Sequence, residues 1–137
     1  TTMKYKKGYK YQLTEDEVFQ LTCKELFPTH HISTRFIELF VDGTYVSKVG
    51  YAWDGVSGFP DLECLQTGGA LHDGLYQLMR EGHIDRSLRA FADQEMYIQF
   101  VKSGCNKNLA YSLKEVVESF GGRFTTAENI KKIHIAP

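Results

Sequence analysis

The stretch GALHDGLYQLMR at residues 69–80 decides the fold of this chain. Four apolar residues recur there at the spacing of one helix face, namely Leu71, Leu75, Leu78 and Met79. His72 and Tyr76 are four residues apart and therefore share a face of that helix. Asp73 follows His72 directly, which places it about 100° around the helix axis. The stretch predicts a helix with an apolar stripe and three polar side chains beside it.

A histidine and an aspartate beside an apolar stripe lose hydration when the helix packs, and this is costly unless they gain partners. Two segments offer such partners. One is the upstream loop at residues 51–61, and the other is a following helix that carries Arg86, Arg89 and Asp93. The grouping predicts either a reactive site or a buried polar cluster that only ties two helices to a loop.

Asp93 is the partner that we expect His72 to meet. The connection at residues 81–85 is short, so the two helices are predicted to be antiparallel neighbours. His72 lies nine residues before this connection and Asp93 eight residues after it, which puts them at about the same height. A carboxylate at that position hydrogen-bonds one imidazole nitrogen and fixes the tautomer of the ring.

The composition is that of an ordinary globular protein. The chain has 137 residues, of which 42% are hydrophobic and 24% charged, and we expect one domain over residues 1–137. The formal net charge of -1 argues against nucleic acid as a partner, because it gives no general attraction to phosphate. No apolar run reaches the length of a membrane span. The sequence does not specify an oligomeric state.

The cysteines predict a reducing compartment. Cys23, Cys64 and Cys105 are odd in number and show no CxxC spacing, which argues against a disulfide framework. Residues 1–7 are not followed by an apolar segment, so we expect no signal peptide there. These features make a cytosolic protein the default expectation.

The first half of the chain is predicted to form strands. Residues 9–13 alternate in polarity and predict a half-buried strand, with 18–21 as the strand that returns beside it. Two β-rich runs at 36–41 and 44–49 flank Asp42-Gly43, which predicts a hairpin with a type I′ turn at that dipeptide.

Helices fill the second half. The helix with His72 is expected to start near Leu62 or Glu63 after a cap at Asp61, and to end at Gly82. A second helix is predicted over 86–103 after a cap at Asp85, and a third over 108–120. Gly68 and Gly69 inside the first helix indicate close approach of another backbone. Strands followed by helices predict an α+β fold of N-terminal antiparallel hairpins packed on about three C-terminal helices, with a central antiparallel pair.

Four segments together resemble an uncharacterised family carried by tailed phages and prophages. They are YAWDGVSG at 51–58, HDGLYQLMREG at 72–82, AD at 92–93 and FGG at 120–122. The resemblance covers residues 9–122. It implies a phage origin and expression inside a bacterium, which makes the host bacterial cytoplasm the expected location. It implies no particular activity.

A second resemblance is to secreted calcium-dependent phospholipases. GFP at 58–60, HDGLY at 72–76 and the later Asp93 stand here in the order found in that family. The resemblance implies that His72 is the general base on a water molecule and that Asp73 is a calcium ligand. It implies that Tyr76 and Asp93 orient the histidine. This chemistry is coherent, because calcium prefers carboxylate and loop carbonyl oxygens and polarises an ester carbonyl.

Other polar residues are candidates for binding a ligand. They are Trp53, Asp54 and Ser57 in the loop, and Arg86 near the start of the second helix. Loop aspartates and serines commonly cap turns instead. Arg89, four residues before Asp93, more simply predicts an ion pair within the helix.

Three functions follow as hypotheses. The first is a hydrolase that uses His72, Asp73, Tyr76 and Asp93. The second is a non-catalytic protein that inhibits a host defence system, either by binding a host protein or by sequestering a small anionic signal. The third is a structural component of the virion or of its assembly.

Overall fold

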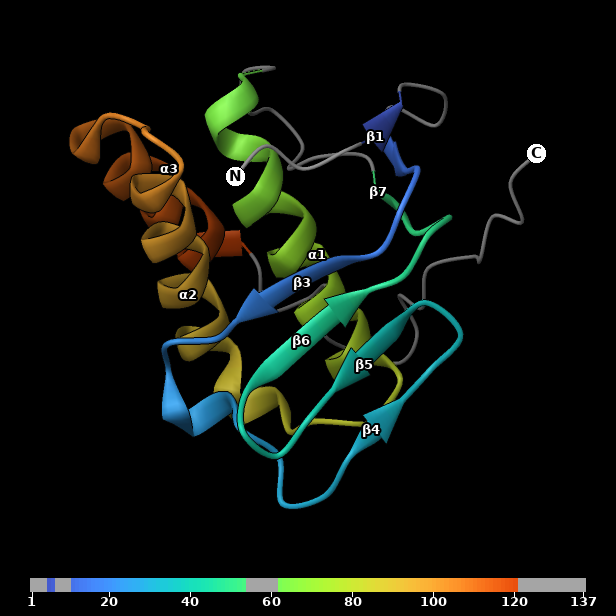
Figure 1. Cartoon of the computed structure of the whole chain (residues 1–137). Coiled ribbons are helices and arrows are strands. Elements are labelled where there is room, and N and C mark those ends of the chain that lie inside the picture. The colour runs from blue at the N-terminus through green and yellow to red at the C-terminus, as the bar shows by residue number, and fades with distance from the viewer. Residues whose placement is uncertain (1–4, 7–10, 54–61, 121–137) are drawn as a thin grey trace.

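The computed structural model describes residues 5–6, 11–53 and 62–120. Strands come first in the chain and helices last, so the predicted α+β fold is confirmed (Figure 1). The strands are β1 (Tyr5–Lys6), β2 (Tyr11–Leu13), β3 (Glu17–Gln20), β4 (Ile32–Ser33), β5 (Ile37–Leu39), β6 (Thr44–Ser47) and β7 (Ala52–Trp53). The helices are α1 (Gln66–Arg80), α2 (Arg89–Lys102) and α3 (Lys107–Phe120), with 3-10 turns η1 (Lys24–Leu26), η2 (Glu63–Leu65) and η3 (Arg86–Leu88).

The strands form two antiparallel sheets, in the orders β1-β2-β7 and β3-β6-β5-β4. The prediction that residues 18–21 return beside residues 9–13 is wrong, because β3 pairs with β6 and β2 pairs with β7. The segment between β2 and β3 bends without reversing the chain. Asp16 in this bend accepts a hydrogen bond from the Val49 amide at 2.7 Å, which ties it to the matching bend between β6 and β7.

The predicted hairpin between β5 and β6 is confirmed, with a different turn. The Gly43 amide donates to the Phe40 carbonyl at 2.9 Å, and the Phe40 amide donates to the Thr44 carbonyl at 2.8 Å. The loop therefore holds three residues, 41–43, and Gly43 with φ of 85° takes the left-handed position that ends it. Asp42 serves as a side-chain acceptor for the Thr44 amide at 2.9 Å.

Gly43→Ala is expected to lower the free energy of unfolding by more than Gly82→Ala. Both glycines have a positive φ, which costs an L residue about 1–2 kcal/mol. A Cβ atom at position 43 also overlaps the ring of Phe27, whereas at position 82 it meets no described atom within 4 Å. Urea unfolding of the two variants measures the difference, and equal losses would contradict the hairpin geometry.

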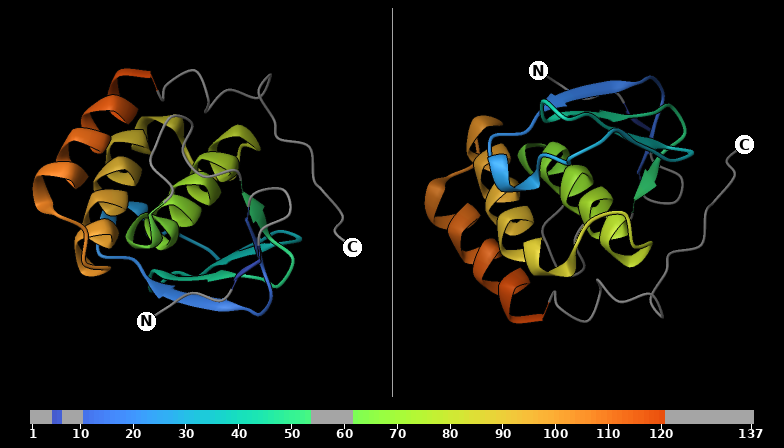
Figure 2. Two further views of the ribbon diagram at one scale, coloured as in Figure 1. Left: turned by 90° about the horizontal axis from the view of Figure 1, so that it is seen from above. Right: turned by 90° about the horizontal axis from the view of Figure 1, so that it is seen from below.

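The helices form one layer on the inner side of the four-stranded sheet, in the order α1, α2 and α3. α1 lies across the inner face of this sheet, α2 packs beside α1, and α3 packs on the far side of α2 (Figure 2). Gly74 permits the approach of α1 to the sheet, because a Cβ atom there overlaps the Tyr45 hydroxyl. The close approach predicted at Gly68 is also confirmed, since its Cβ would lie 2.6 Å from the Phe100 ring and 3.0 Å from the Met96 carbonyl oxygen. At Gly69 a Cβ atom would meet no described atom within 4 Å, so the described residues make no such approach there.

Glycines and short polar residues mark the ends of the helices. Gly82 ends α1 as predicted, with its amide bonded to the Met79 carbonyl and the next amide bonded to the Leu78 carbonyl. Asp85 caps η3 by accepting from the Ser87 amide at 2.8 Å, also as predicted. The predicted cap Asp61 lies outside the described residues. No side chain of the described residues caps the N-terminus of η2 or of α1.

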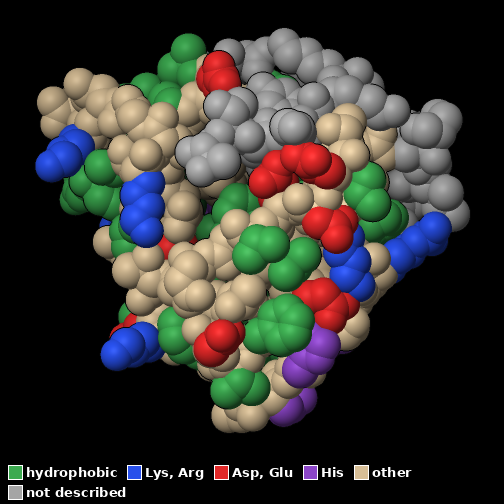
Figure 3. Space-filling view, viewed as in Figure 1, with side chains coloured by type: hydrophobic (Ala, Val, Ile, Leu, Met, Phe, Trp, Pro, Cys, Tyr) green, Lys and Arg blue, Asp and Glu red, His purple; other side chains and the backbone are tan. Residues whose placement is uncertain are grey.

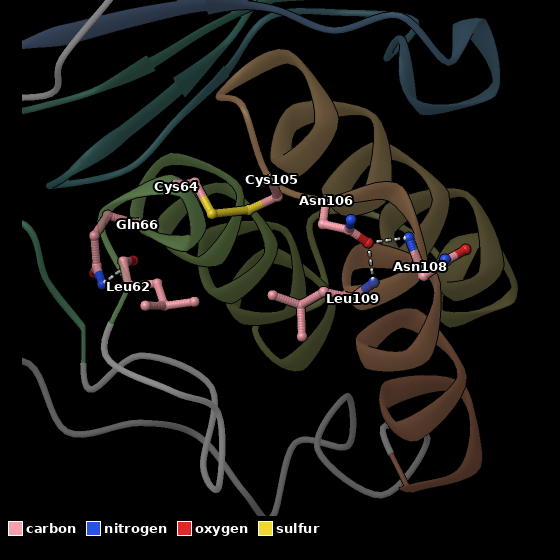
Figure 4. The surroundings of a disulfide bond; sticks show 7 residues. All are labelled: Leu62, Cys64, Gln66, Cys105, Asn106, Asn108 and Leu109. Carbon is pink, nitrogen blue, oxygen red and sulfur yellow. Dashed lines mark hydrogen bonds between the residues drawn. A yellow bond between two sulfur atoms is a disulfide. The ribbon is translucent and has the colours of Figure 1, made fainter.

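A disulfide joins Cys64 in η2 to Cys105 after α2, with their Cα atoms 5.4 Å apart (Figure 4). The expectation that the cysteines form no disulfide framework is therefore wrong for this pair. The two residues are 41 positions apart in sequence, and the antiparallel packing of α1 on α2 brings them together. Cys23 remains a free thiol. Burial and the nearby Glu95 carboxylate raise the pKa of this thiol to about 11, so it stays protonated at neutral pH.

The outer face of the four-stranded sheet is chemically mixed. Hydrophobic side chains lie there among acidic, basic and histidine side chains, and no single sign of charge dominates the view (Figure 3). None of the described helices is long and apolar enough to cross a membrane.

Candidate functional site

The predicted meeting of His72 and Asp93 takes place between α1 and α2. His72 Nε2 lies 2.7 Å from Asp93 Oδ1, and the Tyr76 hydroxyl donates to the same carboxylate oxygen at 2.5 Å. Helical spacing explains the pair on α1, because residues four apart lie one above the other. The His72 and Tyr76 rings are accordingly in contact, with centroids 4.0 Å apart.

All three side chains are buried. Their exposed fractions are 6% for His72, 4% for Tyr76 and 0% for Asp93. Burial and the negative charge of Asp93 raise the pKa of the Tyr76 hydroxyl, so this group stays protonated and acts as a donor. Asp93 Oδ2 makes no hydrogen bond within the described part of the chain.

The contacts of Asp93 define which imidazole nitrogen carries hydrogen. An ionised carboxylate only accepts hydrogen bonds, so Nε2 of His72 is the donor. In the neutral ring Nδ1 then holds the lone pair. Nδ1 forms no hydrogen bond to another residue among 11–53 and 62–120. The arrangement presents a histidine held in one tautomer, with its second nitrogen able to take a proton.

Asp73 belongs to a different cluster from His72. The Tyr51 hydroxyl donates to Asp73 Oδ2, and Tyr51 has only 1% of its surface exposed. Burial is the main reason that the pKa values of Tyr51 and Tyr45 are raised, and the charge of Asp73 raises both further. The two neighbouring positions on α1 thus face two polar clusters, one against α2 and one against the tyrosines of the β6–β7 region.

The described residues do not provide a calcium site at Asp73. Calcium takes six to eight oxygen ligands, commonly from several carboxylates. No group of three or more His, Cys, Asp or Glu residues that could hold a metal ion occurs in the described ranges, and the Tyr51 hydroxyl already donates to the Asp73 carboxylate. We therefore derive no step through calcium from this structure.

The calcium role that the phospholipase resemblance implies for Asp73 stays a prediction, because residues 54–61 of the upstream loop lie outside the described residues. A ligand that binds the folded state raises the melting temperature by mass action, so calcium bound at Asp73 should raise it and Asp73→Asn should abolish the rise. Differential scanning fluorimetry with and without millimolar calcium measures this, and an unchanged melting temperature would contradict the metal role.

The other predicted ligand-binding residues do not gather around His72. Trp53 is 0% exposed in the core and stacks on Tyr11, with ring centroids 5.4 Å apart. Asp54 and Ser57 lie outside the described residues. Arg86 is exposed on η3. Its role in binding a ligand stays a prediction.

The ion pair predicted between Arg89 and Asp93 does not form in the described structure. Arg89 Nη1 donates to the Glu118 carbonyl at 3.1 Å, which ties α2 to the end of α3. The Asp93 carboxylate instead receives the hydrogen bonds of His72 and Tyr76 from α1. Asp93 is thus bound by His72 and Tyr76 of α1 instead of by Arg89 of its own helix.

Glu95 is a buried carboxylate that our sequence reasoning missed. Its Oε1 accepts from the Thr22 and Cys23 amides at 2.7 and 2.9 Å, and its side chain is 0% exposed. Gln99, one turn later, donates to Oε2 at 3.0 Å. The signal in the sequence was a glutamate inside the apolar stripe of α2, directly before Met96. Glu95 anchors α2 to the chain after β3.

Comparison with protein-family models, with curated proteins and with solved structures found no match to this chain. A functional assignment therefore rests on the chemistry of the His72, Tyr76 and Asp93 cluster.

Proposed function

We propose that the protein is a hydrolase of ester substrates in which His72 is the general base. The observation that carries this proposal is the pairing of His72 Nε2 with Asp93 Oδ1, which leaves Nδ1 as the basic nitrogen of the ring. Tyr76 supports the pairing, because its hydroxyl donates to the same oxygen and holds the carboxylate in place. The order of these residues in the chain also matches the phospholipase resemblance.

The cluster supplies the general base and the groups that orient it. Nδ1 takes a proton from a water molecule as the water oxygen attacks the ester carbonyl, and the resulting imidazolium is stabilised by the Asp93 carboxylate. When the tetrahedral intermediate collapses, the imidazolium returns the proton to the leaving alcohol. Asp93 and Tyr76 keep the ring oriented throughout, which is the role that a buried carboxylate plays behind a catalytic histidine.

The setting that we propose for this activity is a bacterium infected by a phage. The four segments that resemble the phage and prophage family support this origin, and the host cytoplasm is then the place of synthesis. We propose an acyl ester of a lipid as the substrate class, because the second resemblance is to phospholipases.

A non-catalytic binder is the second candidate, and the burial of the cluster favours it. With exposed fractions of 6% or less, the three side chains also serve as a clamp between α1 and α2. In that case the protein acts through its surface on a host protein or a small anionic ligand.

His72→Gln separates the two candidates, with His83→Gln as the matched control because His83 is exposed on the turn after α1. Hydrolysis of 4-nitrophenyl butyrate and of a fluorogenic phospholipid in mixed micelles is measured alongside the melting temperature. The hydrolase proposal predicts wild-type activity that falls by about 10²–10⁴-fold in His72→Gln and persists in His83→Gln.

Loss of activity in His72→Gln at an unchanged melting temperature supports His72 as the general base. A wild-type protein with no activity on either substrate, in which His72→Gln lowers the melting temperature, contradicts the hydrolase and supports the clamp.

A further inference from the structure

The helix pair that holds the cluster is closed at both ends. At one end, residues 81–88, which include η3, connect α1 to α2. At the other, the disulfide joins Cys64, just before α1, to Cys105, just after α2. His72 and Asp93 meet between these two closures. Between the disulfide and the cluster, Gly68 on α1 lies close to Phe100 and Met96 on α2.

The end of α1 beside the disulfide is weak by itself. Among the described residues no side chain caps the N-terminus of η2 or of α1, and the first turn of α1 has no acidic residue, although η2 before it carries Glu63. Gly68 and Gly69 stand in that turn, and glycine is among the poorest helix formers. In contrast, Asn106 caps α3 on the other side of the bridge by accepting from the Asn108 and Leu109 amides at 2.8 and 3.2 Å (Figure 4). The disulfide therefore fixes a weak helix start to a well-capped one.

We propose that the Cys64–Cys105 disulfide is a redox switch for the His72 site. When the bond is reduced, the first turns of α1 open and His72 loses its fixed position against Asp93. When the bond is formed, the pair is locked and the site is complete. The effect on activity rests on the proposed hydrolase function, whereas the effect on α1 does not.

The exchange reaction balances with a dithiol as the reductant. Its thiolate attacks the Cys64 sulfur, which is partly exposed, and the electron pair of the broken bond leaves on the Cys105 sulfur, which takes a proton. The second thiol of the reductant attacks the mixed disulfide and releases Cys64, which is protonated in turn. Two electrons and two protons enter the protein, and the dithiol leaves as a disulfide. A disulfide-class oxidant reverses the reaction.

Cys23 does not interfere with this exchange. Its thiol is protonated at neutral pH, and only a thiolate attacks a disulfide. The state of the His72 site then depends on the compartment. A thiol-buffered cytoplasm keeps the Cys64–Cys105 pair reduced, whereas an oxidising compartment forms the disulfide. Synthesis in a host cytoplasm then yields the reduced form, in which Cys64 and Cys105 are thiols.

Amide hydrogen exchange on the full chain, oxidised and dithiol-reduced, tests the switch. The amides of residues 70–73 bond to carbonyls 66–69, and we expect them to exchange at least about tenfold faster after reduction. The β5–β6 hairpin serves as the internal reference and should not change. Cys64→Ser with Cys105→Ser should reproduce the reduced pattern in both conditions, and Cys23→Ser should behave as the wild type.

Gly69→Ala is the matched repair variant, because its Cβ meets no described atom within 4 Å. It should slow the exchange of the reduced form by about fivefold, the effect of replacing glycine by alanine inside a helix. Equal exchange of residues 70–73 in the two redox states overturns the proposal, and so does mass spectrometry that finds three thiols after treatment with a disulfide oxidant. If exchange responds to reduction and neither form hydrolyses an ester, the hydrolase proposal fails and the switch on α1 stands.

Discussion

Asp93 is a carboxylate with no exposed surface, and the arrangement of the helix pair depends on satisfying it. A buried charge without partners is among the costliest features that a fold can contain. Two donors from one face of α1 bind a single oxygen of this group, which fixes both the separation of α1 and α2 and their relative height. The same two contacts fix the tautomer of His72, so the stability of the pair and the chemistry of the histidine have a common origin.

The rest of the structure keeps these two helices in place. Because Gly74 has no Cβ atom, α1 can pack against the Tyr45 hydroxyl on the sheet. Gly68 permits the close approach of α2 to α1 at Phe100 in the same way. Glu95 holds α2 to the backbone after β3, on the side of α2 away from Asp93. The glycines that allow close packing also weaken the start of α1, and the disulfide compensates for this at the same end of the helix. Close packing and local weakness therefore occur together in α1.

Local patterns in the sequence predicted the parts of the site that depend on local geometry. The short connection after α1 and the equal distances of His72 and Asp93 from it were enough to predict that these two residues meet, and the four-residue spacing put Tyr76 on the same face as His72. Contacts over long sequence distances were not accessible in this way. The partners of Glu95 are backbone amides at Thr22 and Cys23, which carry no side-chain signal. The disulfide was missed because an odd number of cysteines argued against pairing, whereas the antiparallel packing of α1 on α2 decides which two meet.

The hydrogen bond between His72 and Asp93 holds the helix pair together. A double-mutant cycle on the free energy of urea unfolding measures this directly, with His72→Ala, Asp93→Ala and the double variant in the oxidised protein. Hydrogen bonds to charged groups contribute about 1.5–3 kcal/mol, so the account predicts a coupling energy of at least about 1 kcal/mol. Additive losses, with a coupling energy within about 0.3 kcal/mol of zero, would contradict it.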